Sequence, residues 1–189
     1  MRDKPPMSIF PSHPHWNQAP HLWLEVGPGR GDFLFAMAAQ HPEITFVAIE
    51  VRHMRFSKLV RQVQEKKLGN IVLIHGMAQE AMPQLFLANS LERIYILFPD
   101  PWPKRSQSHN RLWNSDFFKL CGDLLKPDGK LFLATDVASY ATEAKKSIEK
   151  TAQNWKELST PVDFFETTYA RKWKKLGREL ILSFFTRGG

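Results

Sequence analysis

The sequence predicts an α/β fold in which a mostly parallel central sheet carries helices on both faces. Short apolar runs alternate with longer segments of helical periodicity, and glycine, proline or polar residues bound each run. This alternation implies parallel strands joined by right-handed crossover helices. A chain of 189 residues is long enough for one domain of this kind. We therefore expect a poorly ordered, proline-rich lead-in over residues 1–20 and a single domain over residues 21–189.

The predicted elements follow one another in strand–helix order. Strands are expected at residues 22–26, 45–49, 71–75, 94–98 and 130–135, with a last strand at 179–187. Helices are expected at residues 32–40, 53–67, 79–89, 114–125 and 137–155. Residues 126–129 place proline and aspartate before glycine, which is the composition of a turn.

Composition narrows the class of protein. No run approaches the roughly 18 apolar residues of a membrane span. The first twenty residues lack the apolar stretch of a secretory leader, and the lone Cys121 excludes an internal disulfide. We therefore expect a reduced, cytoplasmic protein without membrane contact. The net charge of +7 favours a polyanionic partner.

The positive charge gathers in two places. Residues 171–178 contain five cations around Trp173, a combination suited to phosphates and a stacked base. A second group recurs every three residues along one side of a predicted helix, for which a solvated face is the simpler interpretation: Arg52, Arg55, Lys58 and Arg61. His13 and His15 lack accompanying cysteines or carboxylates, so we expect no metal site.

A glycine-rich turn follows the first predicted strand and opens the first helix. Gly27, Gly29 and Gly31 allow a tight turn in which a ligand can approach the backbone N–H groups. A dinucleotide fingerprint would have glycine at position 32. Asp32 stands there instead and would repel a pyrophosphate at the helix N-terminus. With Glu25 before the glycines, the turn suits a cationic or amino-bearing ligand.

S-adenosylmethionine has this character, since it carries an ammonium, a sulfonium and an adenosine. Glu50 follows Gly31 by 19 residues and comes at the end of the second strand, where an acid accepts hydrogen bonds from ribose hydroxyls. The alternative for Glu50 is a favourable charge in the first turn of the next helix. The pattern as a whole predicts a methyltransferase-type pocket.

The most distinctive segment is Phe98-Pro99-Asp100-Pro101-Trp102-Pro103-Lys104, which follows residues 91–97, a run typical of a buried strand. Its three prolines fix φ and force the preceding residues into extended backbone. The segment therefore holds Asp100, Trp102 and Lys104 in defined directions at the carboxyl edge of the sheet, where open α/β folds bind ligands. A rigid surface turn is the alternative, and Trp102 could equally fill the core.

Together these residues resemble the bacterial tRNA (guanine-N7)-methyltransferase family, over about Leu22 to Arg187. Residues 98–104 are similar to its S/F-D-P-W-P-K loop, and residues 25–31, 49–50, 135–136 and 167–177 are similar to further motifs in matching order. The resemblance implies a Rossmann-like methyltransferase with an antiparallel C-terminal strand. It also implies methyl transfer from S-adenosylmethionine to guanine N7 in the tRNA variable loop.

The resemblance assigns roles to particular positions. Asp100 is the catalytic position. The implied cofactor-binding residues are Glu25, Gly27, Gly29, Gly31, Glu50, Met77 and Asp100. The implied substrate-binding residues are Lys104, Asp136, Thr167, Thr168, Tyr169 and Ala170. Candidate RNA contacts are Arg105, His109, Arg111, Arg171, Lys174 and Lys175. We expect tRNA as the partner and a monomer or homodimer.

Methyl transfer to guanine N7 is compatible with a carboxylate at the carboxyl edge of the sheet. Guanine N7 already exposes a lone pair, so alignment matters more than a general base. Asp100 would stabilise the cationic product, and Asp136 would accept from guanine N1–H and the exocyclic amine. The alternative for Asp136 is an N-cap of the helix that begins at Val137.

Three positions depart from the family pattern. Met77 stands where an acid is usual, residues 105–111 dilute a basic run, and Ala170 replaces a glutamate. Two other functions therefore remain open. The first is an RNA-binding methyltransferase-like protein with weak or lost catalysis, and the second is a methyltransferase acting on another substrate.

Overall fold

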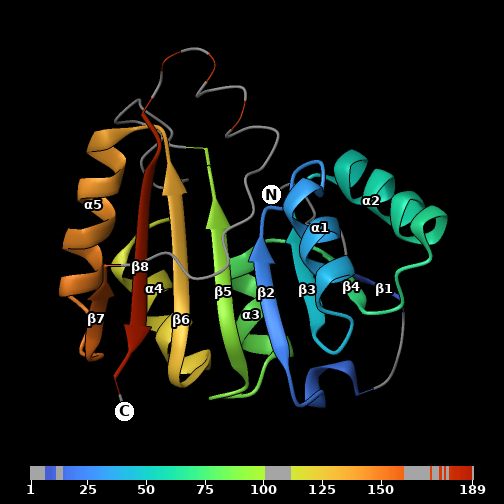
Figure 1. Ribbon diagram of the computed structural model, residues 1–189. Helices are drawn as coiled ribbons and strands as arrows, with labels where there is room; N and C mark the ends of the chain where they lie inside the picture. The colour runs from blue at the N-terminus through green and yellow to red at the C-terminus, as the bar shows by residue number, and fades with distance from the viewer. Residues whose placement is uncertain are drawn as a thin grey trace, which may run out of the picture.

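The computed structural model describes residues 7–11, 15–100, 112–159, 171, 175, 177 and 179–188. Its centre is one eight-stranded sheet in the order β1-β4-β3-β2-β5-β6-β8-β7 (Figure 1). The strands are β1 (Ser8–Phe10), β2 (Leu22–Val26), β3 (Thr45–Glu50), β4 (Ile71–His75), β5 (Leu91–Leu97), β6 (Leu125–Thr135), β7 (Trp155–Leu158) and β8 (Ile181–Arg187). The helices are α1 (Asp32–Gln40), α2 (His53–Lys66), α3 (Ala78–Leu85), α4 (Ser115–Leu124) and α5 (Ala138–Glu149), with a short 3₁₀ turn, η1 (Trp16–Gln18).

The five central strands, β2 to β6, run parallel, whereas β1, β8 and β7 are antiparallel to their neighbours. From β2 the chain first builds outward through β3 and β4, then crosses back to place β5 on the other side of β2. Ligands of open α/β sheets bind at such a reversal, beyond the carboxyl ends of the strands. The predicted mostly parallel sheet with an antiparallel C-terminal strand is confirmed.

Most element boundaries lie within a residue or two of their predicted places. The predicted helix 137–155 is wrong beyond Glu149, because Trp155 begins β7, which pairs with β8. The Trp155 ring meets Phe185 edge-on at 6.5 Å, so pairing across the sheet overrides local helical periodicity.

Helix α3 also ends earlier than predicted. It stops at Leu85 and not at Asn89, because the backbone N–H groups of Asn89 and Ser90 donate to carbonyls at the end of α4. These hydrogen bonds replace the ones that a longer helix would make.

The predicted turn at residues 126–129 lies within the span of β6. Between the pairs Leu91–Leu125 and Arg93–Lys130, β5 advances two residues and β6 advances five. Asp128 has φ 63° there. The turn chemistry therefore produces a bulge inside a strand and not a break before it.

Strand β1 was not predicted. It lies within residues 1–20 and pairs antiparallel with β4, with Ser8 opposite His75 and Phe10 opposite Leu73. Three residues give too short a pattern for recognition from sequence, and the pairing with β4 supplies what local propensity does not.

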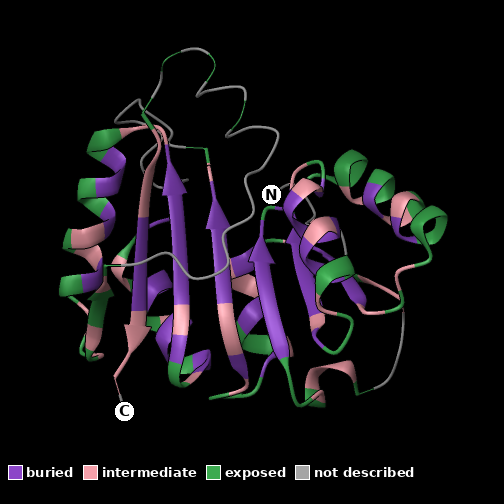
Figure 2. Cartoon of the chain, viewed as in Figure 1, coloured by how far each residue is buried: buried purple, intermediate pink, exposed green. Residues whose placement is uncertain are grey.

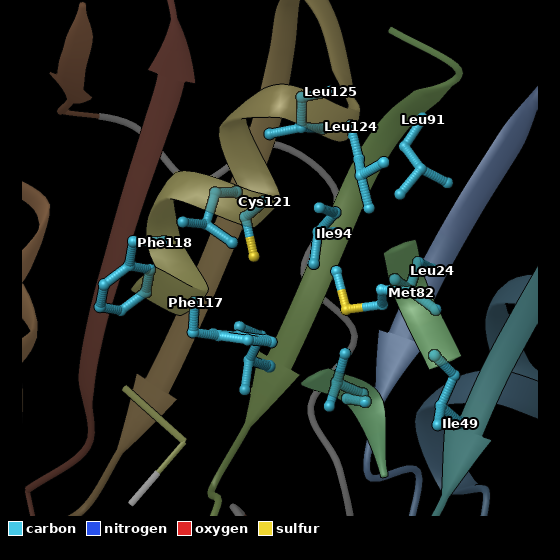
Figure 3. Close-up of a cluster of buried hydrophobic side chains, with 14 of the residues drawn as sticks. Leu24, Ile49, Met82, Leu91, Ile94, Phe117, Phe118, Cys121, Leu124 and Leu125 are labelled. Atoms are coloured by element: carbon cyan, nitrogen blue, oxygen red, sulfur yellow. The ribbon is translucent and has the colours of Figure 1, made fainter. Parts of the chain in front are cut away.

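Helices cover both faces of the sheet. Helices α1 and α2 share one apolar cluster, which includes Phe33 and Leu59, and α1 lies in front of the sheet in Figure 1. Helices α3, α4 and α5 pack on the opposite face. Figure 3 shows part of this second cluster, where Met82 of α3 and Cys121 of α4 meet Ile94 of β5.

Burial is concentrated in the central strands, and α2 is largely exposed (Figure 2). Across the described ranges, no helix has both the length and the hydropathy needed to cross a membrane.

Candidate functional site

Five predicted site residues lie at the carboxyl edge of five neighbouring strands. Met77 follows β4, Glu50 ends β3, Glu25 lies one residue before the end of β2, Asp100 follows β5, and Asp136 follows β6. Neighbouring strands lie about 4.8 Å apart, so the row extends over roughly 20 Å. The fold therefore brings together residues that are 111 positions apart in the chain, in an arrangement long enough for a nucleoside-sized ligand.

The glycine turn lies at the centre of this row. Gly27, Gly29 and Gly31 have φ values of 74°, 61° and 83°, which disfavour any residue with a Cβ. The Gly27 N–H donates to the Ile49 carbonyl at 2.9 Å and ties the turn to β3. A Cβ at Gly27 or Gly29 would meet no described atom within 4 Å, so a ligand has room to approach this backbone.

Glu25 is buried, with 4% of its surface exposed. Burial, followed by the nearby carboxylates of Asp32 and Glu50, raises the pKa of the Glu25 carboxyl from 4.5 to about 8. Within the described part of the chain, Glu25 Oε2 has no hydrogen-bond partner. A buried, unpaired carboxylate is costly, so this atom points to a missing cationic or N–H donor.

Glu50 is buried beside Glu25 with 3% of its surface exposed. Its Oε1 accepts from the Arg52 backbone N–H at 2.8 Å, while its Oε2 finds no partner among the described residues. Glu50 belongs to β3, and α2 has no acid in its first turn. The first-turn alternative for Glu50 is therefore wrong, and its second oxygen remains for a hydroxyl donor.

Asp100 is held at the end of β5 by an unusual backbone. Phe98 has φ 53°, which costs a bulky residue about 1–3 kcal/mol, and its N–H donates to Ala134 on β6 at 2.8 Å. The Asp100 side chain is 64% exposed, and its Oδ2 accepts from Arg52 Nη2 at 3.1 Å. Strain at this point is consistent with a loop shaped for a ligand.

Asp136 follows β6, one strand beyond Asp100, and is half-buried. The N-cap residue of α5 is Val137, without a capping side chain, and the Val137 N–H donates to Thr135 Oγ1 at 3.2 Å. The N-cap alternative for Asp136 is therefore wrong. A role for Asp136 in substrate binding stays a prediction.

Met77 is the N-cap residue of α3 and is 44% exposed. Val51, directly after Glu50, is 57% exposed. These two apolar side chains follow adjacent strands at the same edge, which is compatible with the face of a flat ring.

The basic residues are only partly described. Arg171 and Lys175 are exposed and helical, as isolated described positions. On α2, Arg55, Lys58 and Arg61 are exposed as well, so a solvated face and a phosphate-binding face both remain possible. Outside the described residues lie Trp102, Lys104, Arg105, His109, Arg111, Thr167, Thr168, Tyr169, Ala170 and Lys174.

Sequence analysis missed one contact of this site. Arg52 was noted as part of a basic helix face, and nothing in the sequence indicated that its guanidinium reaches Asp100, 48 residues away. A cation two residues after Glu50 was the available signal, but its partner depends on the order of the strands.

The site fits S-adenosylmethionine on its own chemistry. Two buried carboxyl oxygens without partners among the described residues, an open glycine backbone and exposed apolar side chains match an ammonium, ribose hydroxyls, a methionine chain and an adenine. The fold and this site together define a Rossmann-like methyltransferase.

Solved structures with the same fold agree with this class. The 16S rRNA methyltransferase KamB matches with a TM-score of 0.64 at 14% identity, covering 91% of this chain and 90% of that chain. The antibiotic-resistance methyltransferase Kmr matches with a TM-score of 0.64 at 16% identity, covering 92% of this chain and 90% of that chain. At these identities the likeness concerns the fold alone.

Sequence comparison is more specific. A family described as "Putative methyltransferase" matches residues 19–182. The tRNA (guanine-N(7)-)-methyltransferase of Nitrosomonas europaea is 36% identical over 171 residues, covering 87% of this chain and 75% of the relative. Its counterpart in Chlorobium phaeobacteroides is 34% identical over 150 residues, covering 79% and 73%. The chain belongs to the tRNA (guanine-N7)-methyltransferase family of S-adenosylmethionine-dependent enzymes. The predicted resemblance, enzyme class and cofactor are thereby confirmed.

Proposed function

We propose that this enzyme transfers the methyl group of S-adenosylmethionine to N7 of a guanine in tRNA, at the row of acids described above. The observation that carries the proposal is the succession Glu50, Glu25, Asp100 and Asp136 along four adjacent strands, with two buried carboxylate oxygens still lacking partners among the described residues. Family membership supplies the reaction, and this geometry supports the assignment of its parts.

The cofactor would be held by three groups of residues. Glu25 would accept from the ammonium, Glu50 from the ribose hydroxyls, and the backbone of the glycine turn would lie against the methionine chain. Met77 would pack on the adenine where other family members have an acid. Bound there, the cofactor supplies an electrophilic methyl on a sulfonium.

Asp100 and Asp136 would act on the guanine side of the site. N7 is nucleophilic without a base, so the protein chiefly aligns it and stabilises positive charge on the purine. Asp100 would place its carboxylate beside this charge. Asp136 would accept from N1–H and the exocyclic 2-amine, an adjacent donor pair that guanine has and adenine lacks.

The remaining parts of the assignment concern partners. We infer that the variable loop of tRNA carries the target and that the basic residues at 104–111 and 171–175 bind the RNA. A cytoplasmic location follows from this substrate. A monomer or a homodimer is compatible with the proposal, which places every named acid on one chain.

Asp100→Asn tests the assignment. We expect the variant to lower the rate of methyl transfer to unmodified tRNA by about 10²–10³-fold, because it removes a charge placed at the reacting edge. Calorimetry with S-adenosylhomocysteine should show nearly unchanged affinity. Asp128→Asn is a matched control, since Asp128 is exposed at the start of β6, at the opposite edge of the sheet.

Mapping the modified nucleotide by mass spectrometry separates the competing functions. Methylation at a guanine N7 supports the proposal. Tight tRNA binding without any methyl transfer would favour the RNA-binding alternative. Methylation of a small molecule that bulk RNA does not inhibit would favour a methyltransferase with another substrate.

A further inference from the structure

Arg52 contacts Glu50 and Asp100, two acids on either side of β2, the strand that leads into the glycine turn. Its backbone N–H donates to Glu50 Oε1 at 2.8 Å, and its guanidinium Nη2 donates to Asp100 Oδ2 at 3.1 Å. Glu50 belongs to β3 and Asp100 follows β5, with β2 between these strands. The Arg52 side chain therefore spans the end of β2, directly at the predicted S-adenosylmethionine site.

The backbone of Arg52 is well anchored. Arg52 is the N-cap residue of α2, and its carbonyl accepts from the N–H groups of Arg55 and Phe56 at 2.9 and 3.0 Å. Together with the bond to Glu50, these contacts fix the point from which the guanidinium extends.

Among the described residues, by contrast, the Asp100 side chain has a single orienting contact. Its side chain is 64% exposed, and within the described part of the chain Arg52 is the one hydrogen-bond partner of its carboxylate. A free carboxylate can rotate about its side-chain torsions, whereas one held through Oδ2 presents Oδ1 in a defined direction. Exposed ion pairs contribute little to folding stability, so stability does not account for this contact.

We propose that Arg52 is a positioning residue that orients the Asp100 carboxylate toward the reacting purine. The inference rests on the proposed role of Asp100. The proposed role of Arg52 affects the rate of methyl transfer and not the binding of S-adenosylmethionine. The contact between residue 52 and Glu50 uses the backbone N–H, so it persists in the side-chain variants tested below.

The test compares R52Q and R52K with K150Q, which removes a positive charge from the exposed C-cap position of α5. We expect R52Q to lower kcat by about tenfold, the scale of a misaligned reacting group. Affinity for S-adenosylhomocysteine should stay within about twofold of the wild-type value, since only an interaction used in the transition state is lost. R52K should recover part of kcat, and K150Q should keep all of it.

A double-mutant cycle decides whether Arg52 acts through Asp100. In the D100N background, R52Q should cause no further loss of kcat. An equal loss in both backgrounds, an unchanged kcat in R52Q, or a parallel loss of S-adenosylhomocysteine affinity would overturn the inference. R52M, which keeps the aliphatic stem, provides the same comparison if R52Q does not fold.

The outcomes also separate this inference from the proposed function. Impaired transfer in D100N together with normal transfer in R52Q removes Arg52 alone. Normal transfer in D100N removes both, because the carboxylate that Arg52 would orient then has no part in the reaction.

Discussion

Replacing Glu25 with glutamine measures how much this buried carboxyl group of the predicted S-adenosylmethionine site lowers the free energy of unfolding. The substitution keeps the size of the side chain and removes its ability to ionise. Glu25 is buried, and Asp32 and Glu50 add repulsion, so its pKa is raised from 4.5 to about 8. The folded protein therefore holds a proton on Glu25 at a pH where the unfolded chain has released it.

The sign and size of the effect follow from linkage. Between about pH 4.5 and 8 the native state binds more protons than the unfolded state, so stability falls as the pH rises through this window. Each pKa unit corresponds to about 1.4 kcal/mol, which gives a penalty of about 2 kcal/mol at pH 6 and about 5 kcal/mol above pH 8. E25Q should therefore gain about 3 kcal/mol on the wild type between about pH 6 and 9.

Urea denaturation of both proteins at the two pH values measures this difference. Any constant cost of burying an amide cancels between them. E149Q, the same change at an exposed helix end, corrects for general effects of pH. If the gap between wild type and E25Q does not widen on going from about pH 6 to 9, Glu25 is not protonated in the fold and the reasoning fails.

The proton on Glu25 should also be detectable when S-adenosylmethionine binds. An ammonium requires the ionised form of Glu25, so binding near pH 7 should release a proton in the wild type and none in E25Q. The dependence of the binding heat on the ionisation enthalpy of the buffer measures this release.

Three further substitutions test the stability of the fold, one of them within the glycine turn. Gly31→Ala should cost about 1–3 kcal/mol or more in urea denaturation, because φ is 83° and a Cβ would lie 2.4 Å from Phe35 Cε2; Gly69→Ala, which meets nothing within 4 Å, is the control. Burial alone would raise the pKa of Glu92, but hydrogen bonds with a histidine, a lysine and a tryptophan lower it overall, so E92Q should lose roughly 1 kcal/mol at pH 7 after solvent screening. That loss should disappear as the pH falls below 4.5 and through the folded pKa. Asn114→Ala removes the side-chain cap of α4 and should lower the midpoint of thermal unfolding, at a cost of about 1 kcal/mol.

The sequence specified the central strands because each is a short apolar run closed by turn residues. It specified the glycine turn equally well, since glycines are needed where φ is positive at every second residue from 27 to 31. The parallel order of the strands then brought Glu25, Glu50 and Asp100 to one edge without further information.

What sequence missed depends on pairing across the sheet. Strand β1 and strand β7 have three and four residues, and each is stabilised by a neighbour far away in the chain. The contact between Arg52 and Asp100 has the same origin, because it requires β2 to lie between β3 and β5. The oxygens of Glu25 and Glu50 that lack a partner among the described residues could likewise be recognised only once their surroundings were packed.

The two short outer strands have a consequence for self-association. An edge strand exposes unpaired backbone N–H and C=O groups that can pair with other chains. Because β1 and β7 have only three and four residues, few such groups are exposed at the two edges of this sheet. Removing the first ten residues would uncover β4, whose five residues are largely aliphatic. A chain shortened in this way would have an exposed, apolar edge strand that can pair with other molecules. We therefore expect β1 to limit aggregation as well as to complete the sheet.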